Sequence, residues 1–330
     1  MKKRLLALGM VLMLLAALLS VYGCGGGEEP GTIRIGGLMG PTSMGLVKMM
    51  EDAETDPTAN PYAFTVAGND ASVLTAALLK GELDMIAVPA NLAATLYNNS
   101  NGAVRVLAVN TLGVLHIAEK GDSIRTVEDL RGKTIYAMNQ GTVTEYTLRY
   151  LLTQNGIDPD TDVTLSWKNG SEAQAEVIRA LNQSENGVAM LPQPALTVAM
   201  GNVSGLRDAL DLNEEWEKLP DAPGLITGVM VARTEFVEKY PQTTAKFLDA
   251  YAASTAYVNA NTDAAAALIG KHGIFTESVA KAALPDCNIV CIRGAEMKEA
   301  IEGYLQMIYD QNAAAVGGSM PADDFYYGVS

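Results

Sequence analysis

Hydrophobic and polar positions along the chain follow two kinds of spacing. Short apolar runs rich in β-branched residues, such as 32–38 and 133–138, are each followed by a segment in which apolar residues recur every three or four positions. The first spacing is typical of buried β-strands and the second of helices. Their alternation predicts an α/β protein in which mixed, mainly parallel sheets are flanked by helices.

Two of the predicted strand-to-helix switches carry hydroxyl groups. The stretch GLMGPTS leads from a strand to Thr42 and Ser43, and the stretch MNQGTVT leads from a later strand to Thr142 and Thr144. In the second stretch, Thr142 to Glu145 matches the S/T-x-x-E capping box that opens many helices. We therefore expect a helix to begin at each pair of hydroxyls.

Two further switches contain proline. Predicted strands at 83–88 and 187–191 lead to Pro89 and to Pro192-Gln193-Pro194, respectively. Proline suits the first position of a helix because its missing N–H would have no partner there. A single motif of this kind indicates only the start of a helix. The chain, however, has two hydroxyl switches and two proline switches in matched order. Each half therefore repeats the same pair.

The matched switches predict a ligand site. Ligands of open α/β sheets bind beyond the carboxyl ends of the strands, where helix N-termini gather. Unpaired N–H groups and short hydroxyls can bind a small polar or anionic ligand without the desolvation of a buried arginine. We expect Ser43 and Thr144 to act mainly on the ligand, and Thr142 mainly as a helix cap.

The two halves are predicted to form two lobes. The β-rich segments 104–122 and 222–241 each contain an internal glycine and resemble chain crossings more than flexible linkers. We place the crossings near Thr111–Leu115 and Ile226–Met230, so that one lobe is inserted into the other. The predicted lobes are 31–111 with 229–330, and 112–228.

The N-terminus has the pattern of an export signal. Lys2, Lys3 and Arg4 precede an apolar run over 5–19, which is short for a membrane span and has no stop-transfer charges after it. Val21-Tyr22-Gly23-Cys24 resembles the lipobox of bacterial lipoproteins. The resemblance implies a signal peptide at 1–23, fatty acyl chains such as palmitate on Cys24, and a flexible tether at 24–31.

Charge and length narrow the function further. The chain of 330 residues has a formal net charge of −15, and loss of the basic signal would make it more acidic, so it should repel nucleic acid. Its length suits two lobes. Cys287 and Cys291 would be about 13 Å apart in an extended strand, so a disulfide requires the segment to turn.

An exported hydrolase is the main alternative. Ser43 misses the G-x-S-x-G nucleophile motif because Pro41 stands where glycine is required. The two histidines of the chain are His116, which lies in an apolar predicted strand, and His272. Two separated histidines predict neither a catalytic base nor a metal cluster, so we expect a binding protein with no cofactor, and no enzyme. A structural lipoprotein without a ligand is a second alternative.

From about Thr32 to the C-terminus, the chain resembles the solute-binding proteins of ABC importers. The motifs that carry the resemblance are IRIGGLMGPTSMGLVKM, LLKGELDMIAVPANLA, TVEDLRGKTIYAMNQGTVTEYTLRYLL, GVAMLPQPALTVAM and GGSMPADDFYYG. They are similar to the class II periplasmic-binding-protein fold, in the branch of nitrate, taurine, sulfonate and thiamine-precursor binders.

The resemblance implies a monomer that captures a small polar or anionic organic solute between two lobes and delivers it to a membrane permease. It places the ligand at four turns, whose residues are Met39, Gly40, Pro41, Thr42, Ser43, Pro89, Ala90, Asn91, Gly141, Thr142, Val143, Thr144, Gln193 and Pro194. The chain lacks both a cysteine-rich motif and an arginine in the Gly141 turn, which leaves the ligand class open. Tyr326 and Tyr327 are expected to pack against the body of the protein.

Overall fold

The structure is a computed structural model in which residues 29–68 and 70–329 are described. The chain divides into residues 1–31 and a compact unit of residues 32–330, and every helix and strand below belongs to the second. The predicted signal peptide and Cys24 lie outside the described residues. None of the described helices is both long enough and apolar enough to cross a bilayer.

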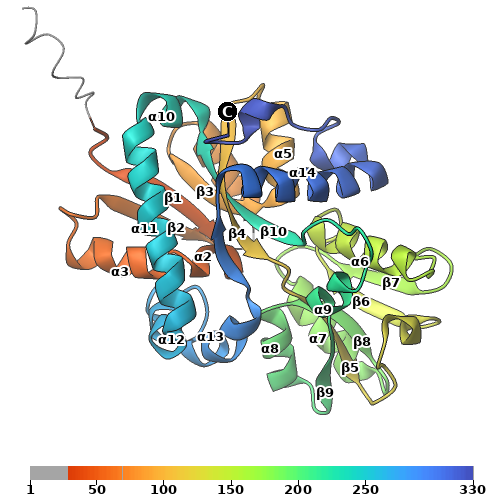
Figure 1. Ribbon diagram of the computed structural model, residues 1–330. Helices are drawn as coiled ribbons and strands as arrows, with labels where there is room; N and C mark the ends of the chain where they lie inside the picture. Colours follow the sequence, from red (N-terminus) through yellow and green to blue (C-terminus); the bar gives the residue numbers. More distant parts are fainter. Residues whose placement is uncertain (1–28, 69, 330) are drawn as a thin grey trace, which may run out of the picture. The chain divides into compact units, whose positions relative to one another are not determined.

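The compact unit contains a first sheet of six strands in the order β11-β4-β10-β3-β1-β2 (Figure 1). Strand β1 pairs in parallel with β2 and β3, whereas β10 pairs antiparallel with β3 and β4, and β11 antiparallel with β4. The bounds are β1 Ile33–Leu38, β2 Tyr62–Ala67, β3 Met85–Pro89, β4 Val104–Leu112, β10 Ile226–Arg233 and β11 Ile289–Ile292.

A second sheet of five strands has the order β7-β6-β8-β5-β9. Strand β6 pairs in parallel with β7 and β8, and β5 pairs antiparallel with β8 and β9. The bounds are β5 Leu115–Lys120, β6 Thr134–Met138, β7 Thr164–Lys168, β8 Val188–Pro192 and β9 Leu206–Asp211. We call the first sheet with its helices the first lobe, and the second sheet with its helices the second lobe.

The α/β class, the two lobes and the mixed sheets are confirmed, and in each sheet most strands run in one direction. Parallel pairing is confined to one side of each sheet in the described residues, and the pairs formed by β4, β5, β9, β10 and β11 are antiparallel. Helical crossovers between neighbouring strands produce the parallel pairs. Strands β5 and β10, which follow the first and the second crossing, run against most strands of their sheets, and so does β11.

Helices cover the faces of the sheets. In the part of the chain that leads to the second crossing they are α2 Pro41–Met44, α3 Val47–Thr55, α4 Ala71–Leu79, α5 Ala90–Asn99, η1 Val127–Leu130, α6 Val143–Gln154, α7 Ala173–Gln183, α8 Ala195–Asn202 and α9 Leu212–Glu217. After it come α10 Thr234–Lys239, α11 Pro241–Ala260, α12 Thr262–Lys271, α13 Glu277–Ala283, η2 Leu284–Asp286, α14 Gly294–Gln311, η3 Ala313–Val316 and η4 Asp323–Phe325.

Helix starts differ from the sequence prediction in detail. Pro89 and Pro194 occupy the N-cap positions of α5 and α8, one residue before the first helical position that we expected for proline. Residues Ser171 to Gln174 also match the capping-box pattern, but the match is not used, because α7 starts at Ala173 with no side-chain cap. A complete capping box forms instead between Thr126 and Asp129 at η1. Local motifs thus identify helix starts to within a few residues.

The first crossing between the lobes is short and tightly held. Only Gly113 and Val114 separate β4 from β5, within the segment predicted from the sequence. The Gly113 carbonyl accepts hydrogen bonds from Asn213 at 3.0 Å and Asn288 at 2.7 Å, and a Cβ on Gly113 would lie 1.8 Å from Asn213 Oδ1. Residue 113 must therefore be glycine because two asparagine side chains converge on it.

The second crossing lies earlier in the chain than predicted. Helix α9 ends at Glu217 and β10 begins at Ile226, which is already paired with Leu112 of the first sheet. The crossing therefore occupies residues 218–225 rather than 226–230. The sequence pattern extends β10 correctly as a strand but does not show which sheet it joins.

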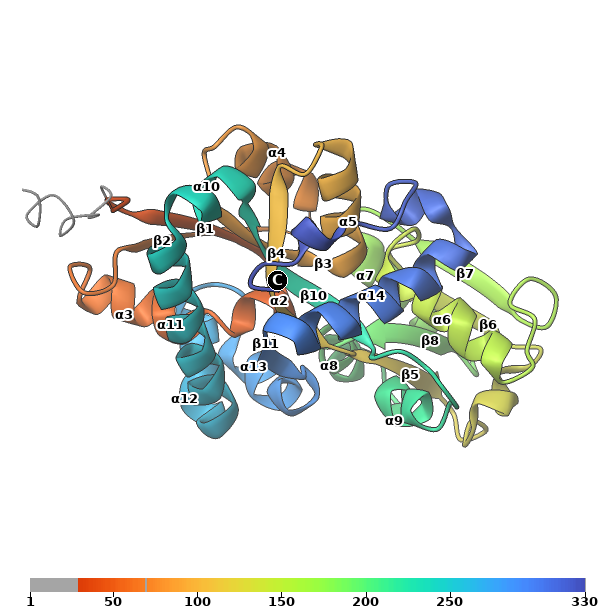
Figure 2. The same cartoon turned by 45° about the horizontal axis from the view of Figure 1, so that its top comes forward.

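Helix α14 connects the lobes a third time, through packing. It lies beside α6 of the second lobe (Figure 2). The buried hydroxyls of Tyr304 and Thr147 are 2.6 Å apart, and Asn312 Nδ2 donates to the Tyr146 hydroxyl at 3.0 Å. One cluster of buried apolar residues includes α14 and strands of both sheets. The lobes therefore share part of their hydrophobic core.

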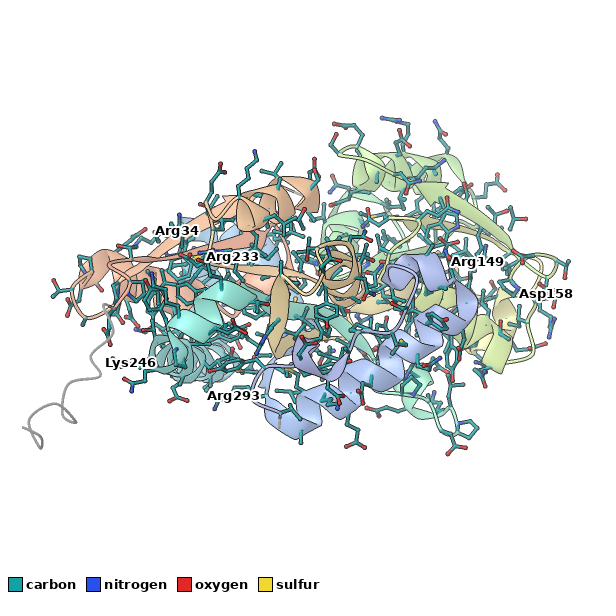
Figure 3. All side chains as sticks on the ribbon, turned by 90° about the horizontal axis from the view of Figure 1, so that it is seen from above. Arg34, Arg149, Asp158, Arg233, Lys246 and Arg293 are labelled. Atoms are coloured by element: carbon teal, nitrogen blue, oxygen red, sulfur yellow. The ribbon has the colours of Figure 1, made fainter. Side chains whose placement is uncertain are left out.

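A buried carboxylate joins three strands of the first lobe. Asp84, at the start of β3, accepts two hydrogen bonds from the Arg34 guanidinium at 2.7 and 2.9 Å and one from Arg233 at 2.9 Å. Figure 3 shows Arg34 and Arg233 converging from β1 and β10. Burial by itself would raise the pKa of Asp84, but the hydrogen bonds from Arg34 and Arg233 lower it below its usual value.

We expect Asp84→Asn to lower the free energy of unfolding by about 2–3 kcal/mol in urea titrations. Losing one partner of a fully buried ion pair costs roughly 3–5 kcal/mol, and the cost should be smaller here because the Arg34 side chain is 41% exposed. Glu238→Gln is the control, because it breaks an exposed pair with Arg105 and should change stability by under about 0.5 kcal/mol. Equal effects of the two substitutions would contradict the structural role of Asp84.

Candidate functional site

The four predicted turns form two pairs, one in each lobe. The turns after β1 and β3 follow neighbouring parallel strands, and so do the turns after β6 and β8. The carboxyl ends of parallel neighbours meet at the same edge of a sheet, so the two turns of each pair lie together. Among the described residues, no hydrogen bond joins a turn of one pair to a turn of the other.

Ser43 has a structural role that differs from our expectation. Its side chain is fully buried, and its hydroxyl donates to the Leu38 carbonyl at 2.6 Å. A Cβ on the neighbouring Gly37 would lie 2.1 Å from Ser43 Oγ, so this glycine makes room for the hydroxyl. Ser43 therefore closes the β1–α2 turn, and its proton is not available to a ligand.

Thr42 retains an uncommitted hydroxyl. Its carbonyl accepts a hydrogen bond from Asn110 Nδ2 at 3.2 Å, while no described residue is hydrogen-bonded to its side-chain hydroxyl. Its methyl group packs against Gly228 of β10, where a Cβ would approach it to 2.5 Å. Asn110 and Gly228 thus fix the turn, and the sequence analysis missed both because they lie on strands far away in the chain.

The other turn of the first lobe, between β3 and α5, is tied to the C-terminal region. Pro89 is half-buried, whereas Ala90 and Asn91 are buried. Asn91 Nδ2 donates to the Ala315 carbonyl of η3 at 3.3 Å, and its Oδ1 is buried without a hydrogen-bond partner. The Asn91 amide thus anchors η3, and only its oxygen is left for another group.

The β6–α6 turn is organised by its own side chains. Gly141 has a φ of 81°, which favours glycine, and its N–H donates to Glu145 Oε2 at 2.8 Å. The Thr142 hydroxyl donates to the Asn139 carbonyl at 2.7 Å and accepts from the Thr144 N–H at 3.3 Å. The cap predicted at Thr142 is present, although Glu145 reaches Gly141 instead of the N-cap residue itself.

Thr144 is the second hydroxyl without a partner. Both Val143 and Thr144 are buried, with 6% of each exposed, and no described residue is hydrogen-bonded to the Thr144 hydroxyl. Leaving a nearly buried hydroxyl without a partner is unfavourable unless water or a ligand satisfies it. Thr42 and Thr144 therefore have the uncommitted donors of the candidate site, one in each lobe.

The β8–α8 turn contacts the first lobe. Gln193 is 4% exposed, and its Oε1 accepts from the Thr197 hydroxyl at 2.8 Å, whereas its Nε2 lies 3.4 Å from Asp286 Oδ2 of η2. Pro194, also buried, caps α8. Gln193 thus bridges the lobes and holds the start of α8 at the same time.

The backbone of Lys168 lies beside the β6–α6 turn. It is the last residue of β7 and is paired in register with Met138, the last residue of β6. Its carbonyl accepts from the Asn139 N–H at 3.0 Å. No described residue forms an ion pair with the Lys168 ammonium. The sequence pattern does not predict this lysine as a site residue, because its position depends on the register of β6 and β7.

His116 lies at the seam between the lobes. It is 1% exposed, and its Nδ1 lies 2.9 Å from Asp208 Oδ2, although the angle is not that of a hydrogen bond. Burial by itself would lower the pKa of His116, but attraction to Asp208 and Asp211 of β9 and to Asp286 of η2 raises it above its ordinary value. Because Asp286 belongs to the first lobe, the imidazolium attracts carboxylates of both lobes.

The C-terminal aromatics pack against the body of the protein, as expected. Tyr326 is 2% exposed and forms a parallel bridge with Val106 of β4, while the Tyr327 N–H donates to the Val106 carbonyl at 2.9 Å. Cys287 and Cys291 are free thiols, and Cys287 is buried. Tyr326 and Cys287 belong to the core, and none of these four residues has a described hydrogen bond to the four turns.

The arrangement of lobes and turns defines a class of protein. Two α/β lobes linked by two crossings, each with paired strand-to-helix turns at one edge of its sheet, are typical of two-lobed binding proteins. A family model described as "ABC transporter, phosphonate, periplasmic substrate-binding protein" matches residues 61–239, which is more than half of the chain. No curated protein is significantly similar in sequence to this chain.

Solved structures show the same fold. An ABC transporter protein from Parabacteroides distasonis has a TM-score of 0.72 at 22% identity over 90% of this chain and 99% of that chain. The periplasmic aliphatic sulphonate binding protein of Escherichia coli has a TM-score of 0.68 at 18% identity over 86% and 88%. The periplasmic nitrate-binding protein of Synechocystis has a TM-score of 0.56 at 16% identity over 79% and 69%.

The chain belongs to the family of periplasmic substrate-binding proteins of ABC transporters. It is thus an extracytoplasmic protein that binds a small molecule and delivers it to a permease, and it is not a hydrolase or another enzyme. The resemblance found in the sequence is confirmed.

We expect the free energy of unfolding to fall as the pH rises above about 6.5. A pKa raised by folding stabilises the protein fully below the unfolded pKa, and this stabilisation is lost as the pH passes through the folded pKa. Urea unfolding between pH 5.5 and pH 9 should show a smaller decline in His116→Gln than in the wild type. A decline of the same size in His116→Gln would contradict the prediction.

Proposed function

We propose that this protein captures a small organic anion with a phosphonate or sulfonate head group between its two lobes. The observation that carries the proposal is the pair of uncommitted hydroxyls, Thr42 and Thr144, which lie at corresponding strand-to-helix turns of the two lobes. The family match and the sulphonate-binding neighbour support this ligand class.

The chemistry of the turns suits a tetrahedral oxyanion. Its oxygens accept several hydrogen bonds at once, and neutral donors such as hydroxyls and helix N–H groups provide them without a buried counter-ion. Helix α6 begins at Val143, so its first N–H groups point towards the turn that holds Thr144. Lys168 adds a positive charge near the same edge, which would favour an anion over a neutral solute.

The proposed site retains the four turns found in the sequence but assigns their residues different roles. Thr42 and Thr144 donate hydrogen bonds to the head group, while Ser43 and Thr142 hold their turns in place. Asn91 and Gln193 position the starts of α5 and α8. The remaining residues shape the walls of the site: Met39, Gly40, Pro41, Pro89, Ala90, Gly141, Val143 and Pro194.

We propose that the two lobes close on the ligand by rotation about the crossings at 113–114 and 218–225. Asn213 of the second lobe and Asn288 of the first lobe both donate hydrogen bonds to the Gly113 carbonyl, and Gly113 provides a short hinge. The packing of α14 on α6 keeps one side of the lobes together, so that closure opens and shuts the opposite side. The closed, liganded form is the one that the permease would recognise.

We further propose that the protein is a monomeric lipoprotein. The lipobox-like sequence ending at Cys24 supports cleavage after residue 23 and acylation of Cys24, with 24–31 as a flexible tether. Two or more acyl chains hold a protein stably on a membrane. The acidic surface would not bind anionic lipid headgroups by itself, so the anchor has to be the lipid.

We expect isothermal titration calorimetry to detect binding of alkanesulfonates or alkylphosphonates but not of the corresponding primary alcohols. Thr144→Val and Thr42→Val should each raise the dissociation constant by a factor of about five to one hundred, because a desolvated hydrogen bond is lost. Lys168→Gln should weaken binding less, and should reduce its dependence on salt.

Ser43→Ala and Thr142→Ala are the matched controls. Each removes a hydroxyl from the same two turns, and should lower the free energy of unfolding by about 0.5–2 kcal/mol while leaving the dissociation constant within about twofold. If neither Thr42→Val nor Thr144→Val changes the affinity for a bound anion, the ligand lies elsewhere. Binding of the alcohols as tightly as the anions would contradict the proposed ligand class.

We expect Cys24→Ala to release the protein from the membrane fraction without changing its fold, because the lipid is the proposed anchor. Cell fractionation with immunoblotting measures the release, and circular dichroism of the released protein checks the fold. A Ser20→Ala variant, altered within the signal but not at the lipidated residue, should stay in the membrane fraction. Retention of Cys24→Ala in the membrane would point to a different anchor.

A further inference from the structure

Three side chains that can bind metals meet on the outer helices of the first lobe. Glu51 and Glu54 are three residues apart on α3, a spacing that places both carboxylates on one face of the helix. His272 follows the last residue of α12, which packs against α3 (Figure 1). One ligand atom from each residue lies within 4.8 Å of the others. None of the three belongs to the proposed solute site.

The imidazole of His272 is aimed into this cluster and lacks a hydrogen bond. Its side chain is only 9% exposed, and its Nε2 is buried without a hydrogen-bond partner. Nε2 lies 3.7 Å from Glu51 Oε2, and Nδ1 lies 3.6 Å from Glu54 Oε1, both too long for hydrogen bonds. Each ring nitrogen thus lies near a different carboxylate without hydrogen bonding to it, and the buried, unpartnered Nε2 suggests that a further group completes the cluster.

Lys271 is the cation that the structure places between the two carboxylates. Its ammonium contacts Glu51 and lies 2.9 Å from Glu54 Oε2. The hydrogen bond from Lys271 lowers the pKa of Glu54 below its usual value. The Lys271 side chain is 47% exposed and can move into solvent when another cation takes its place.

We propose that Glu51, Glu54 and His272 form a binding site for a divalent transition metal, with Zn²⁺ as the preferred ion. Zn²⁺ accepts imidazole nitrogens and carboxylate oxygens as ligands, and water can complete a site with three protein ligands. Bonds of about 2.1 Å in a tetrahedral site place neighbouring ligand atoms about 3.4 Å apart, close to the 3.7 Å between His272 Nε2 and Glu51 Oε2. One ligand atom of Glu54 lies within 4.8 Å of those of the other two residues.

The bound metal would fasten α3 to the end of α12. Both helices pack in the same apolar cluster, which includes Met50 and Ile269. Polar contact between them comes from the ion pairs of Lys271 with Glu51 and Glu54. An ion that binds the folded state alone raises stability by mass action. Lys271 competes for the same carboxylates, so the site exchanges an internal ammonium for an external metal and should bind zinc only moderately tightly.

Zinc binding can be tested on the full-length protein, purified without a histidine tag, by calorimetry and by NMR of the histidine rings. The chain has two histidines, so two sets of ring signals are expected. Zn²⁺ should shift the His272 signals and leave those of His116 unchanged, and His272→Gln assigns them. We expect His272→Gln and Glu51→Gln each to weaken Zn²⁺ binding at least tenfold, because each removes one ligand.

Lys271→Gln distinguishes a metal site from an ion-pair network. Removal of the competing ammonium should tighten Zn²⁺ binding by roughly tenfold, whereas a network that needs Lys271 would bind no metal in either form. Lys281→Gln is the matched control, since it removes the same charge from a pair with Asp263 outside the cluster and should leave Zn²⁺ affinity within about twofold.

Four results would overturn the proposal. The first is no Zn²⁺ binding in either the wild type or Lys271→Gln at 1 mM, which is on the order of the weakest specific affinities. The second is an unshifted His272 NMR signal, and the third is unchanged Zn²⁺ affinity in both Glu51→Gln and His272→Gln. The fourth is Zn²⁺ binding that depends on Cys291 instead. Thermal unfolding should confirm that these variants remain folded. The result of the zinc experiment is independent of the proposed solute site, because Thr42→Val and Thr144→Val should not change the affinity for Zn²⁺.

Discussion

Strand β10 is the constraint on which the rest of the structure depends. It lies between β3 and β4 and pairs antiparallel with both, so the chain must return from the second lobe into the middle of the first sheet. This return fixes both crossings at one end of the sheet. It also places Gly228 against Thr42 and brings Arg233 to Asp84. The ladder of β10 thus assembles the first lobe and shapes one turn of the candidate site.

Buried carboxylates stabilise both lobes of this acidic chain in the same way. In the first lobe Asp84 is held by two arginines. In the second lobe Glu119 is 1% exposed; burial alone would raise its pKa, but hydrogen bonds from Ser123, Ile124 and Arg207 lower it to about 2. A buried carboxylate without partners would be destabilising, and here each carboxylate is compensated by the hydrogen-bond donors next to it. The proposed site can then rely on neutral hydroxyls and on Lys168.

The allocation of hydroxyls at the turns separates structure from function. Ser43 and Thr142 have their protons committed to carbonyls of their own turns, at 2.6 and 2.7 Å, whereas Thr42 and Thr144 are nearly buried and uncommitted. Because hydrogen bonds within a rigid turn fix its geometry before a ligand arrives, the committed pair preorganises the uncommitted pair. The same division of roles in both lobes is what favours a ligand held between them.

The sequence by itself determined the α/β class, the strand-to-helix turns, the cap at Thr142 and the first crossing, because each depends on neighbours within a few residues. It also identified the family, since several local motifs occur in a fixed order. Only the tertiary structure decided the direction of the strands beside the crossings, the burial of Ser43, and the positions of Asn110, Gly228 and Lys168. These depend on strand register and on contacts between segments 68 to 221 positions apart in sequence, such as Thr42 with Asn110 and Glu51 with His272. Periodicity and capping cannot encode such contacts, because they arise when sheets and helices pack.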